Sequence, residues 1–159
     1  MTGAAEVLAL ARARGAMIAT AESCTGGLII GALTAVAGSS DVVDRGFVTY
    51  SNAAKEEMLG VAATTLAAHG AVSEPVAREM AEGALARSRA GLAVSVTGIA
   101  GPVGSEFKPE GRVCFGLARR DGPTRVETVE FGPRGRDAVR GATVAHALDL
   151  LAAALREGA

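Results

Sequence analysis

Hydrophobic and polar residues alternate along this chain with a period that changes from segment to segment. Apolar residues at helical spacing predict helices over 3–14, 25–37, 52–59, 63–69, about 73–88 and 136–156. Shorter runs rich in apolar and β-branched residues predict strands over 16–20, 42–50, 92–96, 112–119 and 125–131. Strands that alternate with helices and finish in a hairpin and a helix predict a three-layer α/β/α sandwich with a mixed sheet.

Cap and turn residues sharpen these boundaries. Gly15 predicts the end of the first helix. Ser73-Glu74-Pro75 predicts the start of another, because proline is favoured in the first helical turn. The apolar run Leu92–Val96 is typical of a central parallel strand and leads into a loop of small residues, Thr97–Pro102. The polar, irregular stretch that follows, up to Glu110, predicts a mobile flap.

Composition narrows the class of protein. A length of 159 residues fits a single domain over 1–159, and 49% hydrophobic with only 3% aromatic residues predicts an Ala/Val/Leu/Ile core. The net charge of −1 argues against nucleic-acid binding, which needs a clustered basic face. No apolar stretch approaches the ~20 residues of a membrane span, and no signal-peptide pattern opens the chain. We therefore expect a soluble cytoplasmic protein with Cys24 and Cys114 reduced. Its Ala-rich helical surfaces favour a homodimer.

The stretch Ala21-Glu22-Ser23-Cys24-Thr25-Gly26-Gly27 is the strongest candidate for chemistry. It joins a predicted strand to a predicted helix, so its hydroxyls and thiol lie at a positive helix N-terminus. Ser23, Cys24 and Thr25 all offer a nucleophile. A serine at a helix start is more often a cap, so a catalytic interpretation requires a base nearby.

Two kinds of base are available. His69 precedes a glycine at a helix end and His146 lies among apolar helical residues, so neither supports a Ser-His-Asp arrangement. Tyr50 ends a predicted strand and Lys55 follows on a short helix, so both can reach the mouth of the sheet near Ser23. A neutral lysine can activate a serine, and a tyrosine can relay the proton. A surface lysine and an interfacial tyrosine are the alternative.

Backbone amides supply further candidate contacts. Those of Thr25, Gly26 and Gly27 are suited to stabilise an oxyanion, because a helix N-terminus presents unpaired N–H groups. The loop Thr97–Gly101 is suited to bind a carbonyl or a phosphate in the same way. This loop matches neither GxGxxG nor the P-loop, and a tight turn is the alternative.

Charged residues add one positive and one negative expectation. Arg134, Arg136 and Arg140 lie near the start of the last predicted helix, where they oppose its dipole, which favours an anionic ligand there. Solvated surface arginines are the alternative for most of them. No group of His, Cys, Asp and Glu has metal-ligand spacing, so we expect no metal and no cofactor.

Five motifs occur in order between residues 20 and 150. They are AESCTGG at 21–27, RGFVTYSN at 45–52 followed by Lys55, GAVSEPV at 70–76, VTGIAGP at 96–102 and RDAVR at 136–140. Each motif alone is weak, but the ordered set is specific. It resembles the C-terminal domain of the CinA competence/damage-inducible proteins and the stand-alone nicotinamide-nucleotide amidases built from that domain.

The resemblance implies a reaction and roles for three residues. The reaction is hydrolysis of the carboxamide of nicotinamide mononucleotide to nicotinate mononucleotide and ammonia, in pyridine-nucleotide (NAD) recycling. Ser23 would be the nucleophile, Lys55 the base, and Tyr50 an aid to proton transfer. The resemblance also implies substrate contacts from one loop, namely Thr97, Gly98 and Ala100. We expect Arg140 to anchor either the substrate phosphate or a loop.

One departure and two alternatives accompany this resemblance. The family usually has Gly-Thr after the flap, whereas this chain has Gly111-Arg112, so Arg112 either adds a phosphate contact or crowds the pocket. One alternative is a Cys24-dependent amidase acting on a related small amide. The other is a non-catalytic nucleotide-binding module, against which the joint presence of Ser23, Tyr50 and Lys55 argues.

Overall fold

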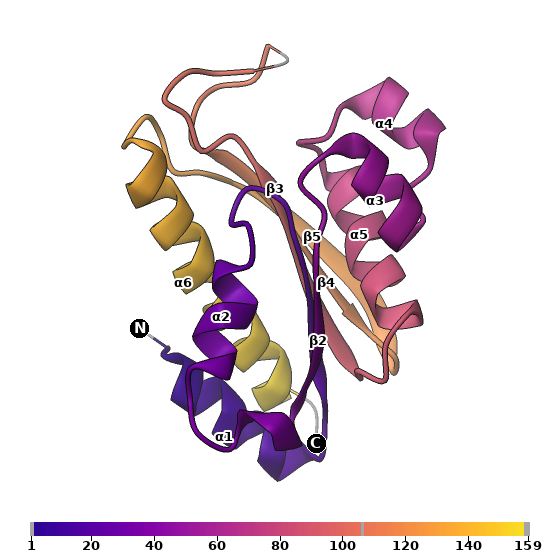
Figure 1. The fold of residues 1–159 in the computed structure, drawn as a ribbon, viewed down its shortest axis with the longest axis vertical. Coiled ribbons are helices and arrows are strands. Elements are labelled where there is room, and N and C mark those ends of the chain that lie inside the picture. Colours follow the sequence, from indigo (N-terminus) through magenta and orange to yellow (C-terminus); the bar gives the residue numbers. More distant parts are fainter. Residues whose placement is uncertain (1, 106, 158–159) are drawn as a thin grey trace.

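A mixed five-stranded sheet forms the middle layer of the computed structural model, which describes residues 2–105 and 107–157 (Figure 1). The strand order is β2-β1-β3-β4-β5. The strands are β1 (Ile18–Glu22), β2 (Val43–Val48), β3 (Leu92–Gly98), β4 (Arg112–Arg119) and β5 (Gly122–Glu130). The first three are parallel, and β4 and β5 are antiparallel to their neighbours. The predicted mixed sheet is confirmed.

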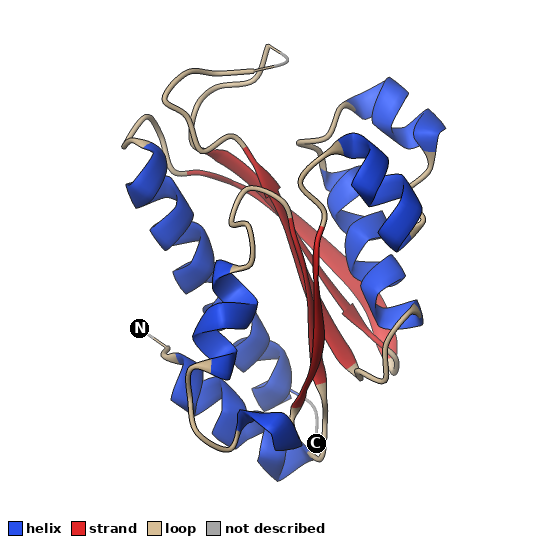
Figure 2. Cartoon of the chain, in the orientation of Figure 1, coloured by secondary structure: helices blue, strands red, loops and turns tan. Residues whose placement is uncertain are grey.

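Helices cover both faces of this sheet (Figure 2). One face carries α1 (Ala4–Arg14), α2 (Leu28–Thr34) and α6 (Arg136–Glu157). The other carries α3 (Asn52–Leu59), α4 (Ala63–His69) and α5 (Glu74–Ala86). A separate apolar cluster of aliphatic residues lies on each side of the sheet. The three-layer α/β/α sandwich predicted from the sequence is therefore the observed fold.

Helix α6 is long and apolar enough to cross a membrane by length and composition alone. In this fold it packs against α1 and the sheet, and its apolar residues Val139, Leu148 and Leu151 are buried in the core. Its hydropathy is accounted for by this packing, because a helix with a buried stripe needs the same residues.

The largest difference from the predicted elements lies around residue 25. The predicted strand 16–20 is observed at Ile18–Glu22, and the predicted helix 25–37 is shortened to Leu28–Thr34. Gly26 and Gly27 have φ of 57° and 104°, in the left-handed region that ends any regular helix. The polar stretch after the strand is therefore a turn, and the helix begins only beyond it.

Strand direction brings the chemistry-bearing segments to one edge. Glu22, the last residue of β1, pairs with Val48 of β2 on one side and Val96 of β3 on the other. The residues that follow these three positions therefore lie beside one another at the carboxyl edge of the sheet. A binding site is expected there in an open α/β sheet. Residues 99–105 and 107–111 project beyond this edge, at the top of Figure 1.

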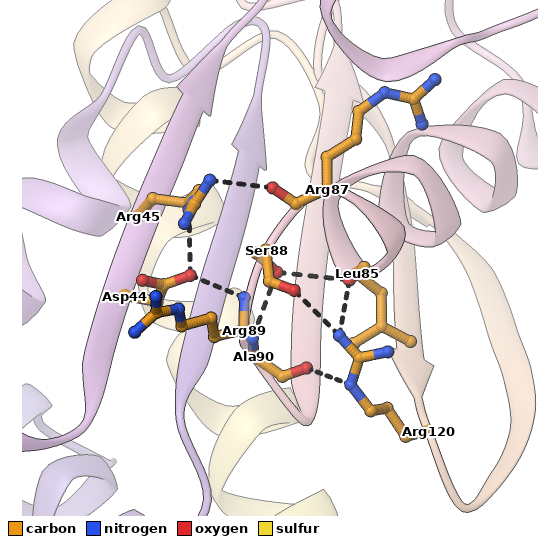
Figure 3. Close-up of polar contacts among 8 residues, drawn as sticks. All are labelled: Asp44, Arg45, Leu85, Arg87, Ser88, Arg89, Ala90 and Arg120. Atoms are coloured by element: carbon orange, nitrogen blue, oxygen red, sulfur yellow. Dashed lines mark hydrogen bonds and ion pairs between the residues drawn. The ribbon is translucent and has the colours of Figure 1, made fainter.

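The amino edge carries a network of arginines that ties strands to the end of α5 (Figure 3). Asp44 accepts from the Arg89 amide at 2.8 Å and from Arg45 Nε at 2.9 Å. Arg45 also donates to the Arg87 carbonyl at 3.0 Å. Arg120 donates to three more carbonyls, those of Leu85, Ser88 and Ala90. These contacts bind main-chain carbonyls at the C-terminal end of α5 and in the segment that follows it, before β3.

Candidate active site

Ser23 and Lys55 meet at the carboxyl edge of the sheet. Lys55 Nζ donates to Ser23 Oγ at 3.1 Å and to the Tyr50 carbonyl at 3.2 Å. The Ser23 hydroxyl lies 3.5 Å from the same carbonyl. Lys55 is 1% exposed and Ser23 is 7% exposed, so the pair is shielded from bulk water. The predicted approach of Lys55 to Ser23 is thus present in the structure.

Local capping explains how Lys55 arrives there. Ser51 is the N-cap of α3, and its hydroxyl accepts from the Ala54 amide at 3.0 Å. The cap fixes the start of the helix, and Lys55 lies on its buried face together with Leu59. Because the cap sets where α3 begins, it also sets that Lys55 falls on the buried face of the helix.

Tyr50 contributes through two different groups. Its carbonyl holds Lys55, whereas its phenolic oxygen accepts from Arg136 at 3.0 Å, and its residue is 62% exposed. Arg136 also donates to the Gly101 carbonyl at 2.9 Å. The phenol therefore lies at the rim with a cation beside it, and the main chain of the same residue serves the Ser23–Lys55 pair.

A pocket of about 310 Å³ opens beside this pair. Its lining includes most of the predicted site residues, namely Ser23, Tyr50, Lys55, Thr97, Gly98 and Ala100. The Thr97 hydroxyl donates to the Ala71 carbonyl at 2.8 Å, which fixes the segment before α5 as the facing wall. The same pocket is lined by residues that sequence reasoning did not single out as binding groups, among them Asn52, Val72 and Ser105.

Arg136 lines the pocket at its rim, beside the Tyr50 phenol. Its position near the start of α6 carried a signal in the sequence, since arginine there opposes the helix dipole. Arg140, chosen from the sequence as the anchor, lies outside the lining and donates to the carbonyls of Cys24 and Thr25 at 3.0 and 3.3 Å. Of its two predicted roles, loop anchor and phosphate anchor, these bonds correspond to the first.

Three other predicted binding residues also lie outside this lining. The Thr25 hydroxyl donates to Glu22 Oε1 at 2.5 Å, and the Gly27 amide donates to the same oxygen at 3.2 Å. The Gly26 amide donates to the Ser23 carbonyl at 3.0 Å. These groups hold the turn that carries Ser23. The amides of Gly26 and Gly27 are therefore engaged within the turn.

Cys24 also lines the pocket, but its thiol is held in the protonated form. Burial raises the pKa of Cys24 to about 11, and the negative charge of Glu22 acts in the same direction. The thiolate is the nucleophilic form of cysteine. This environment favours Ser23 over Cys24 as the attacking group.

The flap and the facing wall are joined by Lys108. Its Nζ donates to the carbonyls of His69 at 2.7 Å and Val72 at 2.5 Å.

His146, the second histidine of the chain, contacts Glu127 and stacks near Phe115, on the α6 side of the sheet. Within residues 2–105 and 107–157, no group of three or more His, Cys, Asp or Glu is placed to hold a metal ion.

Comparison with known proteins identifies the class of domain to which this fold and pocket belong. The family model of the CinA C-terminal domain matches residues 2–155, and the chain belongs to this family. A crystal structure from Klebsiella pneumoniae subsp. pneumoniae, of the competence damage-inducible protein A, superposes with a TM-score of 0.94 at 41% identity, over 98% of this chain and 96% of that one. The corresponding Agrobacterium tumefaciens structure, of protein CihA, has a TM-score of 0.88 at 52% identity and 96% coverage of both chains.

Curated relatives narrow the comparison further. The nicotinamide-nucleotide amidohydrolase PncC of Escherichia coli K12 is 56% identical over 143 residues, covering 88% of this chain and 85% of that protein. A CinA-like protein of Anaeromyxobacter dehalogenans is 53% identical over 152 residues, which cover 94% of this chain but 36% of that protein.

Proposed function

We propose that this chain is a nicotinamide-nucleotide amidohydrolase, which converts nicotinamide mononucleotide and water to nicotinate mononucleotide and ammonia. The observation that carries the proposal is the 3.1 Å contact between Lys55 Nζ and Ser23 Oγ beside the pocket. The 56% identity to an amidohydrolase named for this substrate class supports the choice of substrate. The reaction belongs to pyridine-nucleotide recycling.

The proposed chemistry begins with Ser23. Neutral Lys55 takes the hydroxyl proton as Ser23 Oγ attacks the carboxamide carbon, forming a tetrahedral intermediate. The protonated lysine then returns the proton to the amide nitrogen, the C–N bond breaks, and ammonia leaves. Tyr50 assists this transfer from the rim. Lys55 then takes a proton from a water molecule as the water attacks the acyl carbon. The protonated lysine returns that proton to Ser23 Oγ as the ester bond breaks, which releases nicotinate mononucleotide and regenerates Ser23.

Substrate binding is proposed to run from the pocket floor to its rim. The carboxamide lies near Ser23 and the loop formed by Thr97, Gly98 and Ala100. The phosphate lies at Arg136, because a guanidinium donates well to phosphate oxygens. Support comes from the presence of all these residues in one lining.

The turn after β1 is proposed to act on the reaction through the position of Ser23. The Gly26 and Gly27 amides donate to acceptors in the turn itself, and Thr25 lies outside the pocket lining, so none of these three residues is our candidate for a direct oxyanion contact. Gly26 and Gly27 then act by shaping the turn, and Arg140 by anchoring its carbonyls.

Ammonia release from nicotinamide mononucleotide by the purified protein tests this function. We expect turnover without added metal or cofactor. Binding of the nucleotide without ammonia release would favour a non-catalytic nucleotide-binding module instead. Turnover that depends on Cys24 rather than Ser23 would favour the cysteine amidase.

We also propose a cytoplasmic homodimer. The open edge strand β2 ends in Val48, which is 43% exposed, and Leu28 at the start of α2 is 45% exposed. Both cysteines are unpaired thiols, in keeping with a reducing compartment. Light scattering at several protein concentrations measures the mass, and a monomer at all of them would contradict the dimer.

A further inference from the structure

Glu22 is a fully buried carboxylate with no part in the reaction described above. It is 0% exposed, ends β1, and immediately precedes Ser23. Glutamate is almost never fully buried unless partners compensate for its lost hydration. The partners of Glu22 therefore indicate what the fold gains from this position.

Five groups donate to the Glu22 carboxylate, and they come from both sides of Ser23. Oε1 accepts three hydrogen bonds and Oε2 accepts two. The donors to Oε1 are Thr25 Oγ1 at 2.5 Å, Ile29 N at 2.9 Å and Gly27 N at 3.2 Å. The donors to Oε2 are Ile30 N at 2.9 Å and Thr20 Oγ1 at 3.3 Å. The carboxylate thus holds the strand before Ser23, the turn around it and the first turn of α2.

The main chain at residue 22 holds the other half of the site. The Glu22 carbonyl accepts from the Thr49 amide at 2.8 Å, and Thr49 immediately precedes Tyr50. The Tyr50 carbonyl in turn accepts from Lys55. On the opposite side, the Ser23 amide donates to the Val96 carbonyl at 3.1 Å. One residue therefore fixes both the turn that presents Ser23 and the strand end that holds Lys55.

We propose that Glu22 is a positioning residue, whose buried carboxylate sets the place of Ser23 Oγ relative to Lys55 Nζ. A carboxylate suits this role because both of its oxygens are acceptors, whereas a glutamine presents an NH2 group to one set of donors. That NH2 would face N–H and O–H donors, and the turn would shift to separate them. A shift of about 1 Å in a reacting group costs on the order of 100-fold in rate.

The substitution Glu22→Gln tests this role with little change in volume. We expect kcat to fall by about tenfold or more while KM stays within about threefold, because attack is impaired and the binding wall is untouched. Circular dichroism and a melting curve check that the variant is folded at the assay temperature. An unchanged kcat in folded Glu22→Gln overturns the proposal.

Ser95→Ala serves as a matched control, because it removes a buried hydrogen bond away from the pocket. The Ser95 hydroxyl, 0% exposed on β3, donates to the Ala77 carbonyl of α5 at 2.6 Å. Ser95→Ala is expected to lower the melting temperature without changing kcat or KM. If Ser95→Ala lowers kcat as much as Glu22→Gln does, general destabilisation explains both and the proposal fails.

A second variant covers the case in which Glu22→Gln does not fold. Thr25→Val removes the shortest bond to the carboxylate and keeps the charge. We expect a smaller loss of kcat, about threefold or more, with KM unchanged. A rise in KM at unchanged kcat would assign Thr25 to substrate binding and overturn the positioning role.

The inference rests on the proposed function, and the two can fail separately. Wild-type protein that releases no ammonia overturns the function. Wild-type turnover, with kcat retained in Glu22→Gln and Thr25→Val, overturns the role of Glu22 alone.

Discussion

Polar side chains bond to main-chain groups at both edges of the sheet, but only at the carboxyl edge does a bonded pair of side chains lie beside the pocket described above. At the amino edge, Arg45 and Arg120 donate to main-chain carbonyls, and Asp44 accepts from a main-chain amide (Figure 3). At the carboxyl edge, Ser23 and Lys55 bond to each other beside a pocket. The first set closes chain ends and stabilises the fold. The second set opens onto a ligand space, so one sheet separates stability from chemistry by strand direction.

The sharpest test of this contrast is removal of the nucleophile. Ser23→Ala is expected to lower kcat by about 10⁴-fold or more, because the proposed acyl-enzyme forms on Ser23. Cys24→Ala is the neighbouring control and should keep most activity, since burial keeps that thiol protonated. Steady-state ammonia release measures both. The reverse pattern would place the chemistry on Cys24.

The next largest effect is expected at the base. Lys55→Met keeps the apolar stem and removes the amine, and kcat should fall by about 10²- to 10⁴-fold. In the wild-type protein, kcat should also fall as pH is lowered, because protonated Lys55 cannot accept the Ser23 proton. The pH profile of kcat measures this. A profile flat down to about pH 5 would contradict a lysine base.

A pair of arginine variants compares the edges directly. Arg136→Ala should raise KM by about 10- to 100-fold, the equivalent of about 1.5–3 kcal/mol for a lost charge-assisted hydrogen bond. Arg120→Ala, at the amino edge, should lower stability by about 1–3 kcal/mol and leave KM unchanged. Kinetics and denaturant unfolding of both variants give the comparison. Equal KM values would remove Arg136 from phosphate binding.

The smallest expected effect is at Asp44. The hydrogen bond from the Arg89 main-chain amide, together with the hydrogen bond and charge of Arg45, holds the pKa of Asp44 below its ordinary value. Its charged form is therefore favoured by folding, and its contribution is present above about pH 4 and lost on acidification through the lower folded pKa. Asp44→Asn should cost less than about 1 kcal/mol at neutral pH, because the group lies near the surface. Unfolding at pH 7 and pH 3, with ammonia release unchanged at neutral pH, would distinguish this from an active-site effect.

Much of the fold was accessible from the sequence because its signals are local. The largely apolar run at Leu92–Val96 identifies a buried strand directly, and the alternation of exposed and half-buried residues along β5 is typical of an edge strand. The predicted start of α2 at residue 25 was wrong, because the observed start at Leu28 depends in part on a side chain from β1. Glu22 takes the amides of Ile29 and Ile30, and apolar spacing carries no trace of that contact.

The site was accessible to a lesser degree. The sequence predicted that Lys55 lies near Ser23 at the mouth of the sheet, and the pocket contains both of them together with the Thr97 loop. The sequence could not tell which arginine reaches that pocket, since Arg136 and Arg140 lie about one turn apart on the same face of the helix and differ mainly in their height along its axis. The role of the Tyr50 carbonyl as an acceptor for Lys55 could not be predicted either. Residue type gives no information about a main-chain acceptor.

Lys108 couples the flap to the opposite wall of the pocket. Its ammonium ties the flap to the carbonyls of His69 and Val72, and Val72 is part of the opposite wall. These bonds join the flap to the segment that carries Val72, so we expect a displacement of either segment to move the other. The chain contains just two lysines: Lys55 lies in the pocket, and Lys108 connects the flap to the opposite wall of that pocket.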